Sequence, residues 1–186
     1  MSQKTVIIAI VAIVALGVLS LVGTYNRLVN LDEGVKAAWA KVENQLKRRY
    51  DLIPNLVATV KGYAAHEREV LIAVTQARSR VGQAASVPEQ IAANQELSSA
   101  LARLLVVVEN YPQLKANENF IRLQDELAGT ENRISVERRR YNEAVQAYNI
   151  AIRRFPTNLV ASSLGFQRAP FFEAPRGAEQ APVVSF

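Results

Sequence analysis

The sequence is poor in the residues on which most enzyme sites depend, since its 186 residues include no cysteine and a single histidine. The absence of cysteine excludes disulfide bonds, thiolate metal ligands and lipid attachment at cysteine. His66 and Glu67 begin like the zinc motif His-Glu-x-x-His, but Val70 stands where the second histidine is needed. A di-iron carboxylate site needs two Glu-x-x-His motifs and is therefore excluded as well.

Other common reaction sites are also missing. The eight glycines are scattered, so no glycine-rich phosphate loop is present, and no G-x-S-x-G frame surrounds a serine. We therefore expect no catalytic residue, no cofactor-binding residue and no metal ligand, and predict that the protein is not an enzyme.

The charge is only mildly basic, with a formal net charge of +5. The densest basic runs, Lys47–Arg49 and Arg138–Arg140, lie within helical patterns that also carry acids. We interpret them as solvated helix faces, with contact to anionic lipid headgroups as the alternative. Because no basic face with interleaved aromatic residues is evident, we expect no nucleic-acid partner.

One long uncharged run lies near the start of the sequence. Thr5–Asn26 contains no charged residue, and Val6–Val22 is almost wholly aliphatic. A helix of that length spans about 33 Å, which matches the ~30 Å hydrocarbon core of a bilayer. The sequence predicts a short flank over residues 1–4 and a single transmembrane helix over residues 5–26, with the lipid bilayer as a partner.

The alternative for this run is a cleaved secretory signal, but its apolar length is greater than signals usually have and Leu21/Gly23 offers a poor cleavage site. Lys4 precedes the run, whereas Arg27, Lys36 and Lys41 follow it. The positive-inside rule therefore favours a single-pass protein whose body faces the cytoplasm.

The body is predicted to be helical, because apolar residues recur every three, four or seven positions in four segments, residues 28–46, 53–81, 97–111 and 120–155. Stop or start signals lie between them, at Ser86–Glu89, Tyr111-Pro112, Asn117 and Phe155-Pro156. Asp51 and Pro54 are read as the start of the second helix; alternatively Pro54 only kinks one long helix and leaves a three-helix body. The fold class is thus all-α, with an up-and-down antiparallel four-helix bundle over residues 27–156.

Two acidic residues fall at apolar seam positions of these patterns, Glu67 and Glu137. Either each lies at the rim of the bundle beside an arginine, or the two belong to a buried polar layer that fixes helix register.

The composition changes in the tail, residues 157–186, where prolines and glycines predict an extended chain. Its apolar side chains should bury against this protein's own bundle or against a neighbouring chain. Val184 and Phe186 also have the spacing of a peptide that adds to a sheet edge in a PDZ-type groove. The candidate interface residues are Phe166, Phe171, Phe172, Val184 and Phe186.

Several runs together resemble the LemA family of bacterial membrane proteins, over roughly residues 5–173. They are Tyr25–Val29, Ala38-Trp39, Gln45–Glu67, Tyr111–Ile134, Tyr141–Asn149, Phe155-Pro156 and Gly165-Phe166. The resemblance implies a bacterial cytoplasmic-membrane anchor followed by an up-and-down four-helix bundle. It brings no enzymatic activity and no catalytic residues, and it associates the family with membrane organisation, including magnetosome membranes, and with membrane proteases.

We therefore expect a non-enzymatic, membrane-anchored scaffold that self-associates as a homo-oligomer. The alternative is an adaptor or accessory subunit of a membrane protease or transport complex, which would make such a membrane protein its partner.

Overall fold

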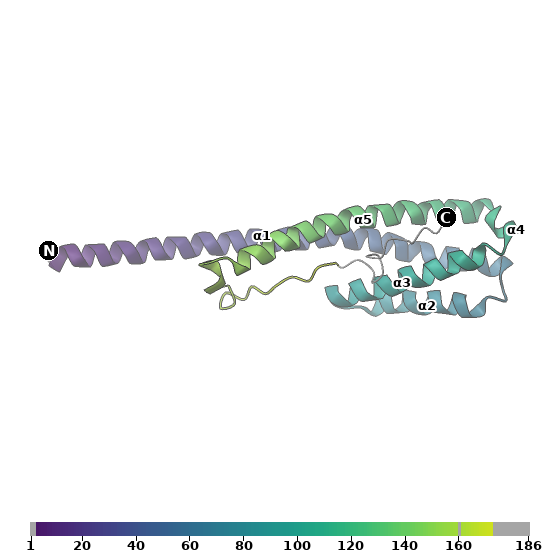
Figure 1. Cartoon of the computed structure of the whole chain (residues 1–186), viewed down its shortest axis with the longest axis horizontal. Coiled ribbons are helices and arrows are strands. Elements are labelled where there is room, and N and C mark those ends of the chain that lie inside the picture. Colours follow the sequence, from purple (N-terminus) through teal and green to yellow (C-terminus); the bar gives the residue numbers. More distant parts are fainter. Residues whose placement is uncertain (1–2, 160, 173–186) are drawn as a thin grey trace, which may run out of the picture. The chain divides into compact units, whose positions relative to one another are not determined.

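The computed structural model describes residues 3–159 and 161–172, and every regular element in these ranges is a helix (Figure 1). The elements are α1 (Gln3–Tyr63), α2 (Arg68–Gln83), α3 (Val87–Val108), α4 (Pro112–Lys115), α5 (Glu118–Arg153) and the 3-10 helix η1 (Thr157–Leu159). The chain forms two compact units. Among the described residues, the first comprises those within 3–39 and 140–169, and the second comprises those within 40–139 and 170–172.

The start of α1 exposes its apolar side chains. Ile13 is 69% exposed and Leu19 is 68% exposed, although isoleucine and leucine are usually buried. In the described part of the chain, two helices are long and apolar enough to cross a membrane: α1 from Ile10 onward and α3. They differ in burial, because α3 places Leu97, Leu104 and other side chains in a protein core, whereas none of the apolar window of α1 is buried.

The predicted boundary between the first two bundle helices is wrong. Helix α1 continues through Pro54 to Tyr63, and the break comes only at the connection that leads to Arg68. A proline inside a helix leaves the carbonyl four residues earlier without its usual donor. Here that carbonyl, of Tyr50, accepts a hydrogen bond of 3.2 Å from Nε of Arg78 on α2. The same guanidinium lies 3.9 Å from the centre of the Tyr50 ring, so tertiary contacts compensate for the proline.

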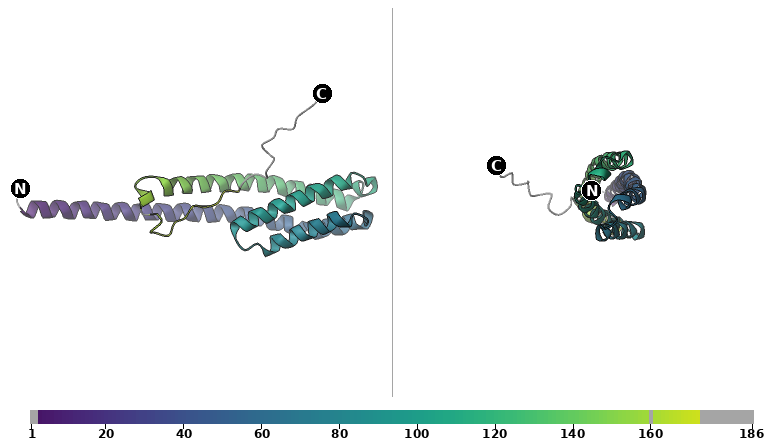
Figure 2. Two further views of the ribbon diagram at one scale, coloured as in Figure 1. Left: turned by 60° about the horizontal axis from the view of Figure 1, so that its bottom comes forward. Right: turned by 90° about the vertical axis from the view of Figure 1, so that its right-hand side faces the viewer.

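The other predicted boundaries are confirmed. Ser86 and Glu89 form a capping box at the start of α3, which satisfies two of the backbone N–H groups that a helix start leaves free. Figures 1 and 2 show α2 and α3 side by side, joined by this short turn. At the start of α5, Oδ1 of Asn117 accepts a hydrogen bond of 3.0 Å from the backbone N–H of Phe120.

The core of the second unit contains residues from all five α-helices, which matches the periodic apolar positions of the sequence. Each fully buried side chain of this size contributes about 1.5–3 kcal/mol of hydrophobic stabilisation. Its most deeply buried large members are Ile53, Leu56, Val60, Val74, Leu97, Leu104, Leu114 and Phe120.

The first unit contains the start of α1, the end of α5 and the turn that follows it. The rings of Trp39 and Tyr141 meet edge to face with 5.2 Å between their centres. Further along, Leu28 packs with Ala151 and Ala161. Of the apolar positions predicted within residues 120–155, Tyr141, Val145 and Tyr148 are buried and Ile152 is half-buried, as expected. The last of them, Phe155, is 79% exposed, so the prediction is wrong at that position.

Candidate functional site: an apolar groove with a buried arginine

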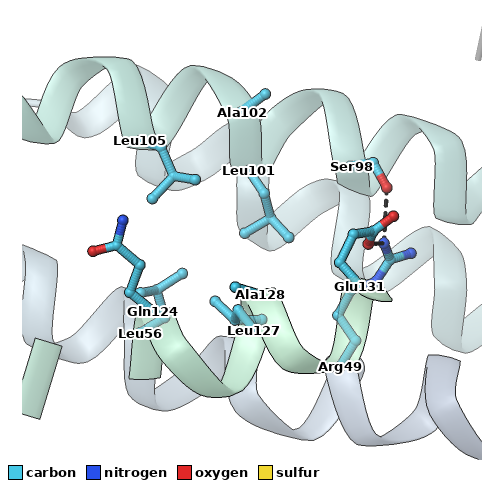
Figure 3. A pocket seen from close by; sticks show the side chains of 10 residues that line it. All are labelled: Arg49, Leu56, Ser98, Leu101, Ala102, Leu105, Gln124, Leu127, Ala128 and Glu131. Carbon is cyan, nitrogen blue, oxygen red and sulfur yellow. Dashed lines mark hydrogen bonds and ion pairs between the residues drawn. The ribbon is translucent and has the colours of Figure 1, made fainter. Parts of the chain in front are cut away.

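A groove of about 300 Å³ lies in the second unit between α3 and α5. Leu56 of α1 contributes to it from below, and the apolar side chains that line it come mainly from the two flanking helices (Figure 3). A polar group of three side chains closes one end of it. The lining residues are Leu101, Ala102 and Leu105 on α3, Gln124, Leu127 and Ala128 on α5, and Arg49, Ser98 and Glu131 at the polar end.

Arg49 is the centre of the polar end, and it is buried to 3% exposure. One guanidinium nitrogen donates to Oγ of Ser98 at 2.8 Å and to Glu131 at 2.9 Å. The other donates to Asn94 twice, to the side-chain oxygen at 2.8 Å and to the backbone carbonyl at 3.2 Å. Burial lowers the pKa of Arg49 from its usual value, and the charge of Glu131 opposes that shift.

Arg49 belongs to the basic run Lys47–Arg49, and the charge pattern predicts a solvated helix face for all three residues, which is wrong for Arg49. Lys47 and Arg48 are exposed, as expected, but Arg49 is buried. The signal was present in the spacing, since Arg49 lies three residues after Leu46 and four before Ile53, both of which belong to the buried seam. Arginine suits such a position because its planar fork satisfies several acceptors at once.

The groove is suited to binding an apolar group. Its volume is about twice the ~150 Å³ cavity that accommodates benzene in a protein core. Because Glu131 already neutralises Arg49, the polar end offers no free cation for an anionic ligand. Among the described residues, no cluster of three histidine, cysteine or acidic side chains is placed to hold a metal ion.

The two acidic residues predicted at the seam lie in different settings. Glu67 is at the N-cap position of α2, outside the helical seam, and its carboxylate accepts a hydrogen bond of 2.9 Å from the hydroxyl of Tyr111. Glu137 is half-buried on α5. The polar layer they were proposed to form stays a prediction. His66 is exposed in the connection between α1 and α2.

Two of the candidate interface phenylalanines pack on their own chain. In the first unit Phe166 meets the ring of Tyr25 edge to face, with 5.7 Å between the ring centres. In the second unit Phe172 is 5% exposed, and the guanidinium of Arg138 lies 5.8 Å from the centre of its ring. Phe171 is 43% exposed. The other two candidates, Val184 and Phe186, lie outside the described residues.

Comparison with known proteins gives consistent matches. A sequence model of the LemA family matches residues 38–186. The chain is 28% identical over 205 residues to magnetosome protein MamQ 1 of Paramagnetospirillum magneticum, which covers 96% of this chain and 75% of the relative. It is 26% identical to magnetosome protein MamQ of Magnetospirillum gryphiswaldense, over 98% of this chain and 76% of the relative. It is 27% identical to protein LemA of Metamycoplasma hominis, over 82% of this chain and 70% of the relative.

Proposed function

Because this chain belongs to the LemA family, we propose that it is a non-enzymatic protein anchored in the cytoplasmic membrane of a bacterium, where it acts as a self-associating scaffold. The observation that carries the anchoring is the uncovered apolar surface at the start of α1. The run Val6–Val22 contains twelve isoleucine, leucine and valine residues. At about −0.3 to −0.6 kcal/mol each near a bilayer centre, they favour insertion by about 4 to 7 kcal/mol.

The body faces the cytoplasm in this proposal, in accord with the basic residues that follow the anchor. Self-association is supported by apolar groups that the described chain leaves uncovered. The groove between α3 and α5 is one of them, since Leu105 is 36% exposed at its rim and Val106 beside it is 71% exposed. A second copy of the chain supplies the occupant, through the apolar residues Val184 and Phe186.

The groove matches the side chains of Val184 and Phe186 in apolar character and in volume. Its walls are aliphatic, and a volume of about 300 Å³ admits an aromatic ring together with a small aliphatic side chain. Anchoring adds to the effect, because two copies held in one membrane meet at a raised effective concentration.

The test is the mass of the intact protein in detergent, measured by light scattering. We expect a discrete assembly larger than a monomer. Replacing Val184 and Phe186 together by serine, or Leu105 by glutamate, should each reduce the assembly to monomers. Phe155→Ser is the matched control, because it removes a phenylalanine that is 79% exposed elsewhere, and it should leave the mass unchanged.

A monodisperse monomer for the unaltered chain would refute self-association and favour the adaptor function, in which a membrane protease or transport complex is the partner. An assembly that survives both the tail and the groove variants would refute the proposed contact while leaving the scaffold intact.

A further inference from the structure

The turn that follows α5 exposes more apolar surface than a water-facing turn normally does. Phe155 is 79% exposed, Leu159 is 65% exposed and Leu164 is 41% exposed. Large apolar side chains that cluster in one short exposed segment mark an interaction surface rather than a solvated loop.

The same segment carries charge of one sign. Arg153, Arg154 and Arg168 flank the exposed apolar side chains and are exposed themselves. No acidic residue occurs between Glu143 and Glu173 in the sequence. Apolar side chains bordered by arginine, with no acid among them, are the composition of segments that bind an anionic lipid surface.

Contacts within the first unit place this turn beside the end of the proposed membrane anchor. Ala161 packs on Leu28, which is two residues beyond the anchor's last residue, or about 3 Å further along the helix. Phe166 packs on Tyr25, inside the anchor's last turn. Figure 2 shows the segment after α5 running beside α1.

The turn is held in this position by hydrogen bonds. The side chain of Asn149 on α5 makes two of them to the backbone of Ala169, at 2.9 and 3.0 Å. Within the turn, the backbone N–H of Phe166 donates to the carbonyl of Ala161 at 3.0 Å. Gly165 has φ +84°, a conformation that glycine adopts without steric cost. A backbone satisfied in this way can enter a poorly hydrated layer without losing hydrogen bonds.

We propose that this turn, residues 155–165, is a second membrane contact that inserts Phe155, Leu159 and Leu164 into the interfacial layer while the flanking arginines contact anionic phospholipid headgroups. The inference rests on the proposed anchoring of α1. The headgroup region begins where the anchor ends, and interfacial segments bury their apolar faces about 5–10 Å into it. The anchor and the turn would then fix the first unit at two points on one membrane surface.

The experiment uses the full chain reconstituted in phosphatidylcholine vesicles with and without phosphatidylglycerol. Because the chain has no cysteine, Leu159→Cys can carry a single environment-sensitive fluorophore. The matched control is Ile72→Cys, an aliphatic position on α2 that is 54% exposed. Circular dichroism confirms that both labelled proteins fold.

We expect the fluorescence emission of the probe at Leu159 to shift to shorter wavelength when the protein is in vesicles. Lipids that carry a nitroxide near the headgroup should quench this emission, and iodide in the aqueous phase should not. The probe at Ile72 should show the reverse. Phosphatidylglycerol should increase the fraction of molecules whose turn is inserted. Replacing the three arginines by glutamine should decrease it, and each replacement should lower the ratio of inserted to water-exposed turn by about fivefold.

The outcomes separate this inference from the anchoring on which it rests. If the protein floats with the vesicles but the Leu159 probe stays as open to iodide as the Ile72 probe, the turn does not insert and the anchor stands. If both probes are quenched alike, or if neither phosphatidylglycerol nor the arginine replacements matter, the proposed contact is overturned. If the protein does not float with the vesicles, the anchor fails and this inference fails with it.

Discussion

Replacing Arg49 by lysine is expected to destabilise the second unit more than replacing it by methionine, although lysine keeps the charge. The reason lies in the surroundings of the guanidinium, which is buried and donates to acceptors on Asn94, Ser98 and Glu131. Lysine keeps the cost of burying a charge but loses the fork that satisfies these acceptors, whereas methionine removes both.

The methionine variant leaves few acceptors without a donor. The hydroxyl of Ser98 still donates to the carbonyl of Asn94 at 3.0 Å. Glu131, whose side chain is 56% exposed, returns to water. The side-chain oxygen of Asn94 remains buried without its donor, at a cost of about 1–3 kcal/mol. Removal of the buried charge offsets part of this cost, so we expect a net loss of about 1–2 kcal/mol.

The lysine variant keeps a charge in the same buried position, with a compact ammonium that cannot reach all four acceptors. Leaving a buried charge poorly compensated costs about 3–5 kcal/mol. Because Glu131 remains in place as a partly exposed partner, the lower end, about 3 kcal/mol, is expected. In a chain of this size the melting temperature falls by about 2–4 °C per kcal/mol, so lysine should lower it about twice as much as methionine.

Thermal unfolding followed by circular dichroism in one detergent measures both variants. The control is Arg48, whose side chain is 53% exposed; its lysine and methionine variants should each lie within about 0.5 kcal/mol of the unaltered protein. If Arg49→Lys is as stable as Arg49→Met, or more stable, then the positive charge stabilises this site more than the hydrogen-bonding geometry of the guanidinium does. That result would refute the prediction.

Three further predictions concern the second unit. Phe120→Ala should lower the free energy of unfolding by about 3–5 kcal/mol in denaturant titrations, since the ring is 1% exposed; a loss below about 1 kcal/mol would contradict its place in the core. The pKa of Glu89 is lowered by hydrogen bonds to its carboxylate, of which the one from the backbone N–H of Ala85 has the largest effect. The ionised carboxylate therefore stabilises the fold at pH values above its ordinary pKa of 4.5, and this stabilisation is lost as the pH falls through the lower pKa of the folded protein. The melting-temperature difference between the unaltered chain and Glu89→Gln should therefore be largest near neutral pH and disappear in acid; a pH-independent difference would exclude this cause. The hydrogen bond to Glu67 raises the pKa of Tyr111 above 10, so Glu67→Gln should let one tyrosine ionise at lower pH in an ultraviolet titration, and identical titrations would refute the contact's effect.

Local sequence signals predicted much of the helical framework. The capping box at Ser86, the proline after Tyr111 and the cap at Asn117 act within three or four residues, so each could be read without knowledge of distant contacts. Most of the buried apolar positions were predicted for the same reason, because helical periodicity depends only on neighbours along the chain. The exceptions, Tyr63 and Phe155, stand at the ends of helical segments and are 44% and 79% exposed.

The candidate site was less accessible to sequence analysis. The groove is formed by residues of three helices that are far apart in sequence, and its polar end depends on Arg49 meeting Asn94, 45 residues away, and Glu131, 82 residues away. A triplet of basic residues gives no indication of which of its members is buried, because that depends on which acceptors face it.

The sequence by itself determined the uncharged run that can span a membrane, the helical class of the body, the stop signals around α3 and the lack of metal-binding or catalytic motifs. Only the tertiary structure decided that α1 continues through Pro54, because the carbonyl left free at Tyr50 finds its donor on another helix. It also decided that Arg49 is buried and that the turn after α5 lies beside Leu28. The physical reason is the same in each case: composition and periodicity act along the chain, whereas the partner that satisfies a buried polar group or covers an apolar surface comes from a distant segment.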